Sequence, residues 1–374
     1  MTRTSTRWRW LIAVVAVLGV FAAACGSSSS KSDSSSTTSS GGGSTKQLPA
    51  ANLNGTGSTF IAAYVNEVAQ AFKQPQPNIT VVYPPTNSGG SGQGQTDLQN
   101  SNGGTTGNQF SGTDVPPPAA DASKYQGGAT LLFPTVAGPI TLSYNLSGVS
   151  TLKLDGETTA KIFLGQITKW NDPAITALNS GASLPDADIV PIHRSEPSGT
   201  TANFATFLKK AAPTVFTGVA DKNFVFPGGK SDTGNGGVVN DIKATPNSIG
   251  YADYSDAKAA ALTFASVKNA DGKFVDASLD GATAAIAGAT VNPDLSYDPL
   301  FATGPKAYPI TAPTYLLVYK NQTDAAKGNA LKAFLQFIYA DGQDIATTID
   351  YAPLSSDLLS KSTAQLKDLV IPAS

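Results

Sequence analysis

One arginine and the hydroxyl-rich turn that follows it carry the clearest chemical signal in this chain. Arg194 stands four residues before the run Ser198, Gly199 and Thr200. Residues 202–210 then have apolar positions at helical spacing and end in lysines, so Ser198 is expected at the N-cap of a helix. The unpaired first amides of a helix, its dipole and a planar guanidinium together suit an oxyanion. The alternative is an ordinary cap beside a surface arginine.

Two other polar segments have a similar character. Thr59 follows a run of glycine and hydroxyl residues and stands at the start of an apolar helical pattern over 60–72. Ser91 lies in the glycine-rich stretch 87–94, which we expect to form a loop. Each of these could be a routine cap or turn by itself. Together with Arg194 they favour an anion-binding protein whose donors come from distant parts of the chain.

The chain has few side chains of the kinds that catalyse reactions, which argues against an enzyme. His193 is the one histidine and Cys25 the one cysteine, so a His/Cys metal cluster cannot be assembled. No serine lies in the G-x-S-x-G pattern of hydrolases. Neither glycine run, 87–94 or 234–237, ends in the Lys-Ser or Lys-Thr of a nucleotide-binding loop. We therefore expect no catalytic residues, no metal and no cofactor.

The N-terminus has the pattern of a secretory leader. Arginines before residue 10 are followed by an apolar run over 11–24, which is short for a membrane helix and typical of a signal peptide spanning 1–24. The alanines just before Cys25 resemble a lipobox, which predicts a lipoprotein lipidated at that cysteine; plain secretion is the alternative. Residues 25–46 are rich in serine and glycine and are expected to form a flexible tether.

Charge and length limit the remaining possibilities. Without the signal peptide the chain has 22 basic and 27 acidic residues, a net charge of about −5, so nothing suggests a nucleic-acid partner. About 325 residues are more than one hydrophobic core usually serves, which predicts two lobes. An anion site on such a protein must be built locally, from oriented dipoles and one or two cations.

Strand and helix patterns alternate along this part of the chain, which predicts an α/β fold. The expected strands cover 79–83 (a buried strand), 140–144, 189–192, 248–252 and 315–319. Further helices are expected over 158–164, 233–243 and 330–339.

Seven ordered motifs resemble the phosphate-binding proteins of the high-affinity phosphate ABC importer. Single motifs of this kind are weak, but their order along nearly the whole mature chain is specific. The matching segments are 55–60 (GTGSTF), 91–94 (SGQG), 110–116 (FSGTDVP), 133–138 (FPTVAG), 163–172 (FLGQITKWND), 194–200 (RSEPSGT) and 248–251 (SIGY).

The resemblance implies a set of phosphate-binding residues. They are Thr59, Phe60 through its backbone amide, Ser91, Asp114, Arg194, Ser198, Gly199 and Thr200, with Ser58 and Glu196 in support. Asp114 would accept a hydrogen bond from a protonated phosphate and repel fully ionised sulfate.

Three departures from the family pattern bear on these assignments. Ser88 and Ser91 both lie in the glycine-rich stretch, and either could supply the hydroxyl. The segment 100–109 before Asp114 is longer and more polar than usual. Glu196 stands where an aspartate commonly accompanies the arginine.

The resemblance also implies the architecture and partners. We expect a two-lobed type II periplasmic-binding fold with the ligand cleft between lobe one, residues 47–138 and 306–374, and lobe two, residues 139–305. The expected protein is a monomer anchored outside the cytoplasm, which binds inorganic phosphate and delivers it to a membrane permease. A binding protein for sulfate or molybdate and a secreted phosphatase-like enzyme are the alternatives.

Overall fold

Strand β4 (Thr130–Asn145) holds the main sheet together. The structure is a computed structural model that describes residues 47–84 and 89–373. In the described residues the main sheet runs in the order β2 (Ile79–Val82), β1 (Ala51–Gly57), β3 (Phe110–Thr113), β12 (Thr311–Tyr319), β4, β8 (Ser248–Asp253), β6 (Val190–Arg194) and β7 (Lys230–Asp232), with β9 (Thr263–Phe264) also paired to β4. A smaller sheet contains β11 (Phe274–Val275), β10 (Ser266–Lys268) and β5 (Lys153–Leu154).

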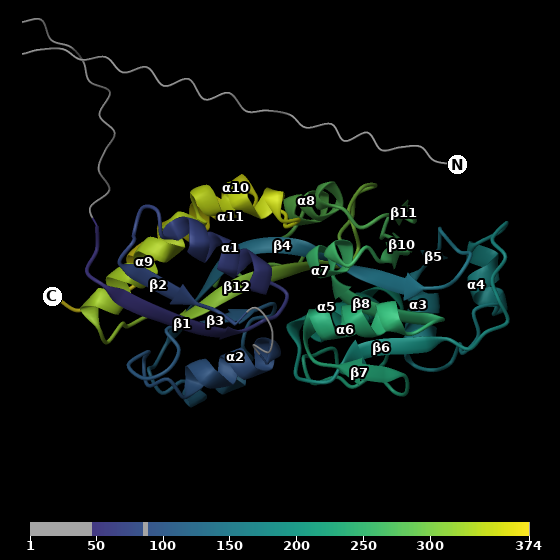
Figure 1. Cartoon of the computed structure of the whole chain (residues 1–374), viewed down its shortest axis with the longest axis horizontal. Coiled ribbons are helices and arrows are strands. Elements are labelled where there is room, and N and C mark those ends of the chain that lie inside the picture. The colour runs from purple at the N-terminus through teal and green to yellow at the C-terminus, as the bar shows by residue number, and fades with distance from the viewer. Residues whose placement is uncertain (1–46, 85–88, 374) are drawn as a thin grey trace, which may run out of the picture. The chain divides into compact units, whose positions relative to one another are not determined.

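Helices alternate with these strands along the chain (Figure 1). The α-helices in the described residues are α1 (Ala62–Phe72), α2 (Gly90–Gln99), α3 (Gly156–Phe163), α4 (Pro173–Leu178), α5 (Gly199–Ala211), α6 (Gly234–Ala244), α7 (Tyr254–Ala259), α8 (Leu279–Ala287), α9 (Ala325–Ile338), α10 (Asp341–Thr348) and α11 (Ser356–Gln365). Short 3₁₀ turns η1 (Ala119–Lys124) and η2 (Leu366–Asp368) complete the set. The α/β prediction is therefore confirmed.

The partner of β4 changes within the strand. Residues 130–139 pair antiparallel with β12, and residues 140–145 pair antiparallel with β8. We call residues 47–138 and 306–373 the terminal part, and residues 139–305 the middle part; Figure 1 shows β4 running from one group of elements to the other. The described residues belong to one compact unit, so the division into two lobes stays a prediction. The predicted lobe boundary after residue 138 lies where β4 changes its partner strand from β12 to β8.

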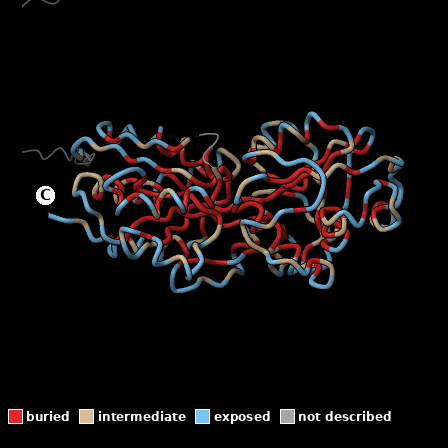
Figure 2. Tube along the Cα trace, turned by 90° about the horizontal axis from the view of Figure 1, so that it is seen from below, coloured by how far each residue is buried: buried red, intermediate tan, exposed pale blue. Residues whose placement is uncertain are grey.

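Buried side chains fill the interior of both parts (Figure 2). In the middle part, Phe204 stacks on Tyr251 with 4.4 Å between ring centroids, and Phe163 packs against Phe204 at 4.9 Å. In the terminal part, Phe72 packs against Phe334 at 5.4 Å. These aromatic contacts fix α5 on β8 and α1 on α9, and α1 and α5 follow two of the predicted anion-binding segments.

Most elements predicted from the sequence are present, with two corrections of detail. The strand predicted as buried over 79–83 ends at Val82 and lies at the edge of the sheet, where Val82 is 48% exposed. Helix α1 begins at Ala62, three residues after Thr59, because Thr59 and Phe60 form a turn in which the Ala62 amide donates to the Thr59 carbonyl at 3.4 Å.

The glycine-rich stretch around Ser91 was expected as a loop, and this prediction is wrong. Ser91 lies in the first turn of helix α2. Its glycines permit close packing: a Cβ on Gly94 would lie 2.4 Å from Gly57 Cα, and one on Gly92 would lie 2.5 Å from Pro197 Cβ. Close tertiary approach therefore outweighs the low helix propensity of glycine.

Several sequence predictions concern residues outside the described ranges. They are the signal peptide over 1–24, lipidation of Cys25, the tether over 25–46 and the possible role of Ser88. Among the helices that the structure describes, none has the length and apolar character needed to cross a membrane.

Candidate functional site

The loop after β1 supplies the first group of predicted binding residues. Ser58 is buried, and its hydroxyl donates to Oδ1 of Asp114 at 2.5 Å while accepting from the Phe60 amide at 3.0 Å. The hydroxyl of Tyr83 donates to the Ser58 carbonyl at 2.8 Å. These bonds fix the loop so that Thr59 points toward the middle part, where its hydroxyl accepts from Asn235.

Asp114 follows β3 and lies at the centre of the network. It is 1% exposed, and Oδ2 accepts from the Ser91 hydroxyl at 3.3 Å. Burial raises the pKa of this carboxyl to about 6, against the opposing effects of the Ser58 hydrogen bond, the charge of Arg194 and the Ser91 hydrogen bond. At neutral pH the Asp114 carboxylate therefore accepts hydrogen bonds, while its burial disfavours the negative charge.

The start of α5 faces Asp114 directly. Ser198 is the N-cap, and its hydroxyl accepts from the Thr201 amide at 3.2 Å, as the sequence predicts. A Cβ on Gly199 would lie 2.3 Å from Ser91 Oγ and 2.7 Å from Asp114 Oδ2, so only glycine allows this approach. The first turn of α5 in the middle part and the acceptor of the terminal part are thus in contact.

The cation is held at the end of β6. The Arg194 side chain is 1% exposed; Nε donates to Glu196 Oε1 at 2.9 Å, Nη2 donates to the same oxygen, and Nη1 donates to the Thr200 hydroxyl at 3.2 Å. Burial opposes ionisation of Glu196, but the charge and hydrogen bond of Arg194 hold the pKa of its carboxyl below the ordinary value. The amide of Gly234 also donates to Glu196 Oε1, at 3.0 Å. Glu196 thus orients the guanidinium, although its side chain is one methylene longer than the aspartate common in the family.

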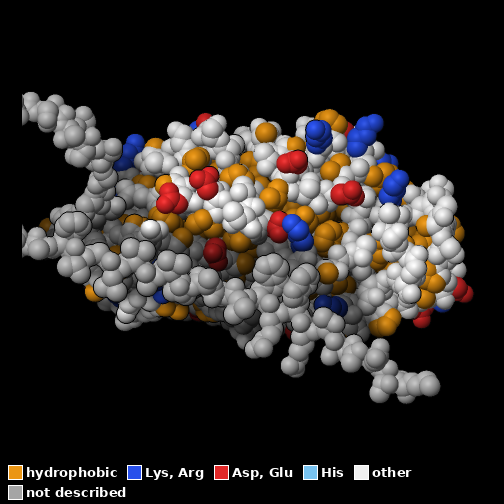
Figure 3. Space-filling model, turned by 45° about the horizontal axis from the view of Figure 1, so that its top comes forward, with side chains coloured by type: hydrophobic (Ala, Val, Ile, Leu, Met, Phe, Trp, Pro, Cys, Tyr) orange, Lys and Arg blue, Asp and Glu red, His pale blue; other side chains and the backbone are white. Residues whose placement is uncertain are grey.

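The structure brings all eight predicted phosphate-binding residues into one buried network. Each is less than 9% exposed, whereas the visible face of the protein in Figure 3 carries scattered acidic and basic side chains on its surface. Arg194 is the only arginine in the described residues. The network therefore combines one fixed cation with hydroxyls, amides and one acceptor carboxylate.

Comparison with known proteins places this geometry in a family. The model of the PBP superfamily domain matches residues 32–342. Phosphate-binding protein PstS 3 of Mycobacterium tuberculosis is 39% identical over 323 residues, which cover 83% of this chain and 85% of the relative. The chain belongs to the PBP superfamily and, within it, to the phosphate-binding proteins. Phosphate-binding protein PstS of Pasteurella multocida is also similar, 35% identical over 266 residues that cover 69% of this chain and 76% of that protein.

Solved structures agree on the fold. A high-affinity periplasmic phosphate-binding protein bound with phosphate matches with a TM-score of 0.66 and 23% identity, over 84% of this chain and 94% of that one. A phosphate-binding protein of Stenotrophomonas maltophilia matches with a TM-score of 0.67 and 20% identity over the same shares. The periplasmic-binding α/β fold predicted from the sequence is therefore confirmed.

Sequence reasoning missed polar residues that support the PBP-type site. Asn203 Nδ2 donates to the carbonyls of Asp114 at 2.9 Å and Gly199 at 3.0 Å, which ties α5 to the acceptor. Tyr351 donates to the Phe60 carbonyl at 2.6 Å or to Asp253 Oδ2 at 2.9 Å. Neither residue lies in one of the seven motifs. Asn203 lies one turn after Gly199 in α5, whereas Tyr351 reaches the site only through the tertiary fold.

Asn235 was also missed, although a signal existed. It lies in the segment Thr233 to Gly237, which was predicted to open a helix, and it is fully buried. An asparagine between glycines at a helix start has the same character as the other anion-binding segments.

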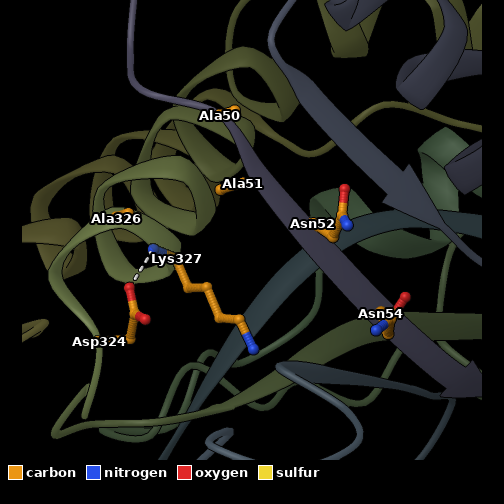
Figure 4. Close-up of a pocket in the computed structure, with 7 residues that line it drawn as sticks. All are labelled: Ala50, Ala51, Asn52, Asn54, Asp324, Ala326 and Lys327. Atoms are coloured by element: carbon orange, nitrogen blue, oxygen red, sulfur yellow. Dashed lines mark hydrogen bonds between the residues drawn. The ribbon is translucent and has the colours of Figure 1, made fainter.

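Two cavities in the described residues can be compared with this network. One of about 410 Å³ lies at the start of β1 and of α9, where Asp324 and Lys327 line it (Figure 4). Asp324 caps α9 by accepting from the Lys327 amide at 2.9 Å. A second, of about 240 Å³, lies beside Asp114 and Asn203. No group of three or more His, Cys, Asp or Glu in the described residues is placed to hold a metal.

Proposed function

We propose that this chain binds inorganic phosphate outside the cytoplasm, between its terminal and middle parts, and delivers it to the permease of an ABC transporter. Membership of the phosphate-binding proteins supports this role. We further propose that the protein acts as a monomeric solute-binding protein without catalytic activity. Lipidation of Cys25 would anchor it to the cell membrane.

The observation that carries the proposal is the position of Asp114 against the start of α5 and near Arg194. Arginine and the first amides of a helix attract any oxyanion. A buried carboxylate beside them repels an anion unless that anion brings a hydrogen to donate. Phosphate at neutral pH carries such a hydrogen and sulfate does not. The combination therefore selects phosphate over sulfate or molybdate.

Each predicted residue has a role in this proposal. The hydroxyls of Thr59, Ser91, Ser198 and Thr200 and the amides of Phe60 and Gly199 would donate to phosphate oxygens. Arg194 would pair with two oxygens, held by Glu196, and Asp114 would accept the phosphate hydrogen, held by Ser58. In the described arrangement the Phe60 amide donates to Ser58 Oγ. We expect that amide to change its acceptor when phosphate binds.

Calorimetric titration with phosphate, sulfate and arsenate tests the proposal. The wild-type protein should bind phosphate and arsenate tightly and sulfate weakly. Asp114→Ala and Arg194→Ala should abolish tight phosphate binding while keeping the far-ultraviolet circular dichroism spectrum. Lys169→Ala is the matched control for a lost cation, because Lys169 is half-exposed and pairs with Asp186 and Asp188. Wild-type affinity in either site variant would overturn the site assignment.

Two further measurements test the rest of the proposal. Incubation with a phosphate monoester should release no phosphate above background, and turnover would instead favour a phosphatase-like enzyme. Replacing Cys25 by serine should release the protein from membranes into the soluble extracytoplasmic fraction. Equal membrane retention of both forms would contradict the lipid anchor.

A further inference from the structure

Asn235 contacts two of the predicted phosphate-binding hydroxyls at once. It lies in the first turn of α6 in the middle part and is fully buried. Its backbone amide and its Nδ2 each donate to Thr59 Oγ1 at 3.2 Å. Nδ2 also donates to Thr200 Oγ1 at 3.4 Å. Asn235 therefore links a hydroxyl of the terminal part to a hydroxyl at the start of α5.

These bonds determine where the two hydroxyl hydrogens can point. A threonine hydroxyl has two acceptor lone pairs and one hydrogen. Thr59 Oγ1 accepts twice from Asn235, and Thr200 Oγ1 accepts once from Asn235 and once, at 3.2 Å, from Arg194 Nη1. Both oxygens thus have their acceptor positions filled by N–H groups. Each hydrogen remains available for an acceptor that the protein itself does not supply within the described residues.

A hydrogen bond to the oxygen of the Asn235 side-chain amide fixes which way that amide points. Its Oδ1 accepts from the backbone amide of Asp253 at 3.2 Å. A backbone amide can only donate, so this bond requires Oδ1 to face Asp253 and Nδ2 to face the two hydroxyls. Asp253 is itself buried at the end of β8. The start of α6 therefore presents three N–H donors in a defined direction.

We propose that Asn235 is a positioning residue for phosphate: it fills the acceptor positions of Thr59 and Thr200 so that both hydroxyls must donate to the bound anion. The inference rests on the proposed phosphate-binding function. It explains why an amide, rather than another hydroxyl or a carboxylate, stands at this position. A carboxylate here would accept both hydroxyl hydrogens and turn them away from phosphate.

Substitutions at Asn235 test this inference by calorimetry with inorganic phosphate. Asn235→Ala should weaken binding roughly 10- to 100-fold, since two charge-assisted hydrogen bonds lose their fixed direction. Asn235→Asp keeps the shape and should weaken binding by more than about 100-fold, because it adds a negative charge and accepts the hydroxyl hydrogens. Melting temperatures are measured in parallel without phosphate.

A double-mutant cycle separates positioning from a general structural effect. In a Thr59→Val background, Asn235→Ala should weaken binding by clearly less than in the wild type, because only the Thr200 hydroxyl is left for Asn235 to position. The matched control is Asn269→Ala: Asn269 is equally buried at 3% exposure and donates through Nδ2 to the Gly304 and Ala307 carbonyls, away from the site. It should lower the melting temperature and leave phosphate affinity unchanged.

Each outcome decides between explanations. Absence of phosphate binding by the wild-type protein would refute the proposed function itself. If the wild type binds phosphate, unchanged affinity in Asn235→Ala and Asn235→Asp would overturn the positioning role alone. An equal loss in the wild-type and Thr59→Val backgrounds would do the same, because Asn235 would then act independently of that hydroxyl.

Discussion

Replacing Asp114 by asparagine should make the phosphate-free protein more stable at neutral pH. The carboxyl is buried, and its pKa is about 6 instead of the ordinary 3.8. A raised pKa means that the folded protein binds more protons than the unfolded chain between about pH 4 and pH 6. Holding the ionised carboxylate in the fold therefore costs stability, in full above about pH 6 and progressively less as the pH falls toward 4.

The pKa of Asp114 sets the size of this cost. A rise from 3.8 to about 6 corresponds to about 3 kcal/mol at pH 8, as an order of magnitude. Asparagine carries no charge but makes weaker hydrogen bonds with Ser58, which removes about 1 kcal/mol of the gain. We expect Asp114→Asn to raise the free energy of unfolding by about 1–3 kcal/mol at pH 8.

Urea unfolding at pH 8 and pH 4, without phosphate, measures the effect. The increase in the free energy of unfolding should be present at pH 8 and nearly absent at pH 4, where the wild-type carboxyl is protonated. Asp186→Asn is the control, because the Asp186 side chain is 74% exposed and pairs with Lys169; its effect should stay below about 0.5 kcal/mol. A less stable Asp114→Asn variant at pH 8, or an equal difference at both pH values, would refute the reasoning.

Four other changes probe the same site and its packing. Gly199→Ala should weaken phosphate binding at least tenfold, by about 1.4 kcal/mol or more, because its Cβ would lie 2.3 Å from Ser91 Oγ; wild-type affinity in a titration would contradict this contact. Lowering the pH through about 6 protonates Asp114, so the preference for phosphate over sulfate should narrow, and a constant ratio of dissociation constants would count against Asp114 as the discriminator. Gly94→Ala should destabilise the fold by about 1–3 kcal/mol, since its Cβ would lie 2.4 Å from Gly57 Cα. Gly236→Ala, with no atom within 4 Å of its Cβ, should stabilise α6 by up to about 1 kcal/mol. Thermal melting measures both glycine variants.

Features that depend on residues close in sequence could be predicted well. Ser198 was predicted as an N-cap from its neighbours, and the structure confirms it because capping depends on residues within one turn. The segments predicted to bind an anion were identified in the same way, and the ordered motifs added Asp114 as the predicted acceptor, which no local pattern marks. The pairing of Arg194 with Glu196 could also be predicted, because the two residues are only two positions apart in the sequence.

Features that depend on tertiary contact were missed or wrong. Helix α2 was expected as a loop because its glycines disfavour helix, and the close approaches of Gly94 to Gly57 and of Gly92 to Pro197 explain why they are there. The glycines around Asn235 mark a helix start, but they do not identify its partner, because Thr59 lies 176 residues away in sequence. Tyr351 reaches the Phe60 carbonyl across a separation of 291 residues. Such pairings are set by the fold of the whole chain.

The position of β12 in the main sheet has a consequence for how the protein is made. This strand, residues 311–319, lies between β3 and β4, which are formed by residues before 146. During synthesis from the N-terminus, β3 and the first half of β4 therefore keep unpaired edges until the last sixth or so of the chain has emerged. Sheets that depend on such distant pairing form slowly. The sheet of the terminal part therefore cannot be completed until residues 311–319 have been synthesised.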